Sequence, residues 1–198
     1  MNRLIYSALS SRFGALLELQ ILMRQTAKAF GVGAPKAPRI AERFFNCGAS
    51  CRRPKGGGVS IAARRSNPEL LKAYAQFTAE EAVRAIQHGD NLERLHQKLY
   101  EMAYALGSRL RRWLRPGDKK DCLAIVTLLY RNIGIQLEKE SPGTIYIRRC
   151  YFSNFYTPEI CSVISAVDQG IFAGIYQGGK LTFRERITEG CAVCRADF

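Results

Sequence analysis

The sequence predicts an α+β fold in which N-terminal helices precede a small antiparallel sheet with one packed helix. Three observations support this class. Helix start and stop signals recur between Asn67 and Gly134. After Gly134 the apolar residues change from helical spacing to strict alternation. A further helix pattern then separates two strand pairs, which gives the order hairpin, helix, hairpin.

Residues 1–65 are expected to form a helix over residues 3–29, ending at Gly31, followed by an irregular segment rich in Gly and Pro. This part holds twelve Lys or Arg against two Glu, a charge of +10 out of +13 for the chain. Such asymmetry indicates a basic arm that faces an acidic partner or an anionic surface. A solvated segment without a fixed partner is the alternative, since the arm carries no nucleic-acid-binding motif.

Three helices are expected next, over residues 68–88, 90–115 and 118–133. Asn67 is the predicted N-cap of the first, with Pro68 at its first position. Asp90 is the predicted cap of the second, and Asp118 begins the third. Their succession predicts an antiparallel bundle.

The C-terminal part is expected to contain a hairpin over residues 134–150 and a helix over 157–175, followed by a strand pair at 181–188 and 192–198. Thr157 is the predicted cap of that helix. We therefore divide the chain into a basic arm, residues 1–65, and one α+β domain, residues 66–198. The domain has a helical part, 66–133, and a cysteine-bearing sheet module, 134–198.

Composition predicts a cytoplasmic protein with no transmembrane segment, because no run of about 18 apolar residues occurs. The chain has seven cysteines and no export signal is expected at residues 1–30. In a reducing compartment such cysteines more often bind metals or act as thiols than form disulfides.

Four cysteines and one carboxylate are candidates for a metal or catalytic site. Cys161 and Asp168 share one stripe of the helix at 157–175, and Cys191 and Cys194 form a Cys-x-x-Cys pair. Cys150 ends the strand before the helix, so the set can converge and would suit zinc. Alternatively, Cys150 and Cys161 are small buried hydrophobic residues. The pair Cys47 and Cys51 is a weaker candidate.

Arg184, Arg186 and Thr188 alternate along one expected strand face, beside the thiols. Two arginines in such a position can hold a carboxylate substrate through paired hydrogen bonds. An exposed basic strand face is the alternative.

The segment Cys161-x6-Asp168-Gln169-Gly170, together with LTFRERITEGCAVCRADF at 181–198, resembles the close of two related families. One is the L-2-amino-thiazoline-4-carboxylate hydrolase-like family, and the other is the 4-vinyl reductase-type ligand-binding domain. The resemblance covers residues 134–198 and implies a small α/β architecture. It also implies Cys161 and Cys194 as zinc ligands, whereas Thr188 stands where the second family has another cysteine.

The resulting hypothesis is a hydrolase that opens a C–N bond in a small cyclic or amidine-like carboxylic acid. Asp168 and Arg186 are its expected catalytic residues, and Arg184 and Thr188 its expected substrate-binding residues. The pocket is expected between the helix at 157–175 and the strands at 181–198. The alternatives are a non-catalytic small-molecule-binding or sensory domain and an accessory protein that docks through its basic arm. A homodimer is left open.

Overall fold

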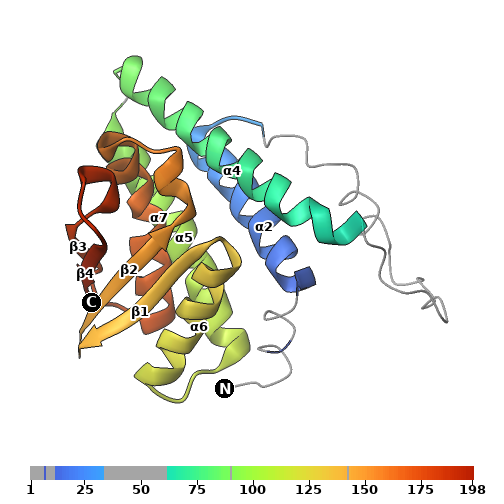
Figure 1. Cartoon of the computed structure of the whole chain (residues 1–198), viewed down its shortest axis with the longest axis vertical. Coiled ribbons are helices and arrows are strands. Elements are labelled where there is room, and N and C mark those ends of the chain that lie inside the picture. Colours follow the sequence, from blue (N-terminus) through green and yellow to red (C-terminus); the bar gives the residue numbers. More distant parts are fainter. Residues whose placement is uncertain (1–6, 8–11, 34–61, 90, 142) are drawn as a thin grey trace.

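A computed structural model describes residues 7, 12–33, 62–89, 91–141 and 143–198. Within these described residues the main elements are five helices and four strands, with two short 3₁₀ turns (Figure 1). In order they are α2 (Arg12–Phe30), α4 (Ala62–Gln87), α5 (Leu92–Leu114), α6 (Lys119–Asn132), β1 (Ile135–Ser141), β2 (Thr144–Cys150), η1 (Tyr151–Asn154), α7 (Pro158–Tyr176), β3 (Thr182–Glu185), η2 (Ile187–Glu189) and β4 (Cys194–Asp197). The predicted α+β class, with its order of hairpin, helix and strand pair, is confirmed.

Helix boundaries follow capping side chains where these are strong. Asp118 caps α6 by accepting from the Asp121 N–H at 2.8 Å, and Thr157 caps α7, both as predicted. The helix α5 is instead capped by Asn91, which accepts from the Arg94 N–H at 2.9 Å. The predicted cap, Asp90, lies outside the described residues.

The predicted start of α4 is wrong, because the helix begins at Ala62 and Pro68 lies inside it. The preceding residues Ala62, Ala63, Arg64 and Arg65 are strong helix formers, so Asn67 continues the helix and does not cap it. The helix therefore runs without a break through residues 65 and 66, where the sequence suggested a boundary between arm and domain.

The sheet is antiparallel with the strand order β1-β2-β4-β3. In the register of β2 and β4, Ile145 faces Ala196 and Ile147 faces Cys194. These four side chains are buried and belong to the hydrophobic core. The sheet thus buries one face against the helices, as expected for an α+β layer.

The central element is α7, which is buried around nearly its whole circumference. It packs most extensively against α5, and also contacts α4, α6 and η2. The α5 and α7 backbones approach closely because glycines face each other: a Cβ at Gly107 would lie 2.6 Å from the Ile171 carbonyl oxygen. In Figure 1 the β1-β2 hairpin lies in front of these two helices.

The helix α2 belongs to the same hydrophobic core. Leu19, Leu22 and Met23 are almost completely buried and join the core cluster formed by the other helices and the sheet. In the part of the chain that the structure describes, no helix is both long and apolar enough to cross a membrane.

Candidate functional site

A partly open cavity of about 70 Å³, called the internal cavity below, lies between α7 and the segment that includes η2 and the start of β4. Elements from the whole chain contribute to it, including α2 through Leu22 and η1 through Phe152. Most lining side chains are apolar, but polar and thiol side chains also line the cavity, three of them from α7. Among them are Cys150, Ser153, Cys161, Ser165, Asp168, Thr188 and Cys194.

Asp168 projects from α7 and lines the cavity. Protein atoms surround its carboxyl, although the residue keeps part of its accessible surface. Its Oδ1 accepts a hydrogen bond from the Tyr130 hydroxyl of α6 at 2.6 Å. Burial raises the pKa of the carboxyl to about 6, while Tyr130 and Arg186 act in the opposite direction. Among the described residues, no cation forms an ion pair with this carboxyl.

Two tyrosines, Tyr74 and Tyr156, form part of the cavity wall behind Asp168. The Tyr74 hydroxyl hydrogen bonds with Thr26 Oγ1 at 3.1 Å, and the Tyr156 hydroxyl with Thr78 Oγ1 at 2.5 Å. Burial raises the pKa of Tyr74 to about 12 and raises that of Tyr156 as well. Both hydroxyls therefore stay neutral at physiological pH and leave the negative charge on Asp168.

Three of the four candidate cysteines, Cys150, Cys161 and Cys194, line this cavity. Burial raises the pKa of Cys150 to about 12 and that of Cys194 to about 11, and also raises that of Cys161. Because the thiolate is the reactive form, protonated thiols are weak nucleophiles. Cys191 lies in the loop before β4 and does not line the cavity.

Within the described ranges, no three His, Cys, Asp or Glu side chains are arranged to hold a metal ion. The described cavity thiols are therefore not grouped around one point. Zinc at these cysteines stays a prediction. The weaker pair, Cys47 and Cys51, lies outside the described residues.

Arg186 does not line the cavity itself but contacts residues that do, and only 14% of its side chain is exposed. Its Nη2 is 3.4 Å from Ser165 Oγ and its Nη1 is 4.0 Å from Cys161 Sγ, and both partners line the cavity. The guanidinium also stacks over the Phe183 ring at 4.8 Å and pairs with Glu189 at 3.7 Å. Arg186 therefore forms its ion pair with Glu189 and not with Asp168.

The two arginines do not share an environment, because β3 ends at Glu185 and η2 interrupts the expected alternation. A register irregularity between Phe183 and Glu185 adds to this difference. The Arg184 side chain is 71% exposed, forms an ion pair with Asp197 and does not line the cavity. Thr188 lines the cavity, and its buried Oγ1 has no well-formed hydrogen bond within the described structure. It lies close enough to Cys161 to lower the pKa of that thiol.

Sequence reasoning missed Ser165 and the three tyrosines of this site. Ser165 lies four residues after Cys161 and three before Asp168, so the helical stripe that joins those two residues also contains it. No comparable spacing marks Tyr130, which lies among the apolar residues of α6 and meets Asp168 only through the tertiary packing.

Comparison of the chain with protein-family models, with curated proteins and with solved structures finds no match.

Proposed function

We propose that the internal cavity binds a small cyclic or amidine-like carboxylic acid, with its N–H donors on Asp168 and its carboxylate toward Arg186. The observation that carries this proposal is a buried carboxyl that faces a cavity and has no ion-pair partner among the described residues. A buried charge is costly unless a partner compensates it. An amidinium group supplies that charge together with two N–H donors.

The other polar groups suit the remaining parts of such a ligand. Arg186 is already held beside the cavity by Ser165 and by the Phe183 ring, so a carboxylate can bind there with little further ordering. The Thr188 hydroxyl is buried and offers one more hydrogen bond.

The size of the cavity limits the ligand. A volume of 70 Å³ holds about five water molecules at ~10–15 Å³ each. This matches a small ring with one acidic substituent and is too small for a nucleotide cofactor. Apolar side chains line most of the cavity and would surround the ring.

Hydrolysis of a C–N bond in the bound ligand is a second candidate, favoured by the pKa of Asp168. A carboxyl with a pKa of about 6 is mostly ionised at neutral pH and is a stronger base than an ordinary aspartate. It would accept the proton of a water molecule that attacks the amidine carbon and return that proton to the leaving nitrogen as the C–N bond breaks, while Arg186 holds the carboxylate. The resemblance of residues 134–198 to the thiazoline-carboxylate hydrolase-like family supports the same reaction.

Isothermal titration with 2-amino-thiazoline-4-carboxylate tests the proposal. Wild-type protein is expected to bind, and Asp168→Asn and Arg186→Gln are each expected to weaken binding at least about tenfold, the loss typical of a buried charged contact. Arg184→Gln should leave the affinity unchanged, because Arg184 is exposed and paired with Asp197, whereas Arg186 contacts two residues that line the cavity. Equal losses in Arg184→Gln and Arg186→Gln would restore the two-arginine site expected from the sequence.

Turnover is measured in the same samples by mass spectrometry, as a product heavier by one water molecule. Product formation that Asp168→Asn abolishes would support the hydrolase. Binding without product would support the non-catalytic domain, and absence of binding would contradict the proposed ligand class.

The zinc prediction has its own test, since it does not depend on the ligand. Elemental analysis of protein purified without chelator would support zinc if the metal is near-stoichiometric and falls in Cys161→Ser and Cys194→Ser. Metal-free protein with unchanged thermal stability would contradict it.

A further inference from the structure

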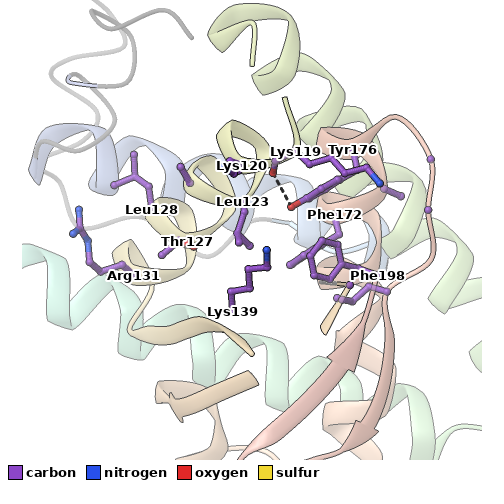
Figure 2. A pocket seen from close by; sticks show the side chains of 16 residues that line it. Lys119, Lys120, Leu123, Thr127, Leu128, Arg131, Lys139, Phe172, Tyr176 and Phe198 are labelled. Carbon is purple, nitrogen blue, oxygen red and sulfur yellow. Dashed lines mark hydrogen bonds between the residues drawn. The ribbon is translucent and has the colours of Figure 1, made fainter. Parts of the chain in front are cut away.

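A second hollow, separate from the internal cavity, lies between α6, the C-terminal half of α7 and the tip of the β1-β2 hairpin (Figure 2). It is an open groove of about 770 Å³ and shares no lining residue with the cavity. Its volume falls in the range of ~300–1,000 Å³ that is usual for small-molecule sites.

The floor of the groove is a fixed aromatic cluster. Phe172 and Tyr176 stack with ring centroids 6.0 Å apart, and Phe198 meets Tyr176 edge-on at 5.2 Å. The Tyr176 hydroxyl donates to the Lys119 carbonyl oxygen at 3.4 Å, which ties the cluster to the start of α6. Leu123 of α6 and Leu181 extend this apolar surface. A ligand therefore meets a surface that is already ordered.

Four cations also line the groove. Lys119, Lys120 and Arg131 come from α6 and Lys139 comes from β1, and Figure 2 shows Lys139 between α6 and the aromatic cluster. No Asp or Glu is among the described residues that line the groove. None of the four cations forms an ion pair with a described residue. Such a concentration of one sign in a concave site attracts anions.

We infer that this groove binds a small amphipathic phosphate monoester, with its apolar body on the aromatic floor and its phosphate among the cations. A phosphate monoester carries a charge of about −2 at neutral pH, so it suits a site that presents several cations better than a monoanion does. The concave form and aromatic floor distinguish the groove from a flat basic surface, which would suit a membrane or a nucleic acid.

Titration calorimetry with octyl phosphate, inorganic phosphate and n-octanol tests both halves of the site. Octyl phosphate is expected to bind at least about tenfold more tightly than either fragment, because only it uses both the floor and the cations. Lys139→Gln and Arg131→Gln should each weaken it about threefold, as exposed charge contacts do, and raising the ionic strength should also weaken it. Lys98→Gln, which removes an exposed lysine of α5 outside the groove, is the matched control.

Equal affinities for octyl phosphate and inorganic phosphate would overturn the role of the aromatic floor. Unchanged binding in the Lys139→Gln, Arg131→Gln double variant would overturn the location.

Loss of octyl phosphate binding in Asp168→Asn would assign the ligand to the internal cavity instead, whereas failure of the thiazoline ligand alone would leave this groove supported. Tighter binding of anionic vesicles or of an acidic peptide than of octyl phosphate would assign the groove to a macromolecular partner.

Discussion

Burial of the ionised Asp168 carboxylate destabilises the folded protein, and no ion pair with a described residue offsets this. Its pKa is about 6 in the folded protein against an ordinary 3.8, so the folded state holds the proton more tightly than the unfolded state. The contribution of this carboxyl to the free energy of unfolding is therefore largest below pH 3.8. It falls as the pH rises toward 6 and stays low above that pH. Retaining such a residue fits a functional role, because unfavourable pKa shifts cluster at functional sites.

Tyr130→Phe is expected to destabilise the protein more at high pH than at low pH. The variant removes the donor to Asp168, which matters more when the carboxyl is ionised. We expect a loss in the free energy of unfolding of about 1 kcal/mol at about pH 5 and about 2 kcal/mol at about pH 8. Urea unfolding at the two pH values measures both.

Tyr104→Phe on the surface of α5 is the control and should show no pH-dependent loss. Equal losses at both pH values in Tyr130→Phe would mean that Asp168 does not change its charge in this range.

The site residues differ in how far the sequence could identify them. Asp168 and Cys161 were recognisable because helical spacing places them on one stripe of α7, and both line the cavity. Strand alternation predicted that Arg184 and Arg186 share one face of a strand. The two side chains lie in different environments because β3 ends at Glu185 and η2 follows. Tyr130 becomes a partner of Asp168 through the packing of α6 on α7, which no local pattern encodes.

At the scale of elements, the close contact between α5 and α7 positions Asp168, since Gly170 and Gly174 follow it on α7. A Cβ at Gly170 would lie 2.7 Å from the Ala103 Cβ and would also overlap the Tyr100 carbonyl oxygen. The backbone atoms of α5 cannot move aside as a flexible side chain can, so the helices would have to separate.

Gly170→Ala is therefore expected to lower the free energy of unfolding by about 1–3 kcal/mol, the usual cost of overpacking. Gly33→Ala, where an added Cβ meets no atom within 4 Å, is the control and should change it by less than about 1 kcal/mol. Thermal or urea unfolding compares the two. A neutral Gly170→Ala would show that the α5–α7 contact is looser than described.

Element types were predictable where local signals agreed, and boundaries were less so. Asp118 and Thr157 cap their helices as predicted because their side chains satisfy free backbone N–H groups. The sequence Asn67-Pro68 carries the same type of signal, yet the helix-forming residues before it extend α4 to Ala62. A cap marks a helix start only when the preceding residues do not themselves favour helix.

At the scale of the whole molecule, α2 shares one core with the remaining helices and the sheet, which bears on the division into a basic arm, residues 1–65, and a separate α+β domain. Leu19 is completely buried and belongs to the common hydrophobic cluster. Leu22 from the same helix lines the internal cavity. Removal of this helix would therefore open both the core and the site.

Leu19→Ala is expected to reduce the free energy of unfolding by about 2–5 kcal/mol, through lost burial and the hole left behind. Lys28→Ala, at an exposed position of α2, should change it by less than about 0.5 kcal/mol. Both variants are compared by urea unfolding in the full chain. A loss below about 0.5 kcal/mol in Leu19→Ala would support an arm that folds apart from the domain.

The proposed function requires that Asp168 has no ion-pair partner in the ligand-free protein, so that its carboxylate can bind a ligand. A ¹³C NMR titration of the Asp168 carboxyl carbon, assigned by comparison with Asp168→Asn, measures this directly. We predict a pKa of about 6 in the ligand-free protein. Saturation with 2-amino-thiazoline-4-carboxylate should lower it, because an adjacent cation stabilises the carboxylate. A pKa at or below 3.8 without ligand would contradict the account, since the carboxylate would then already be compensated within the fold.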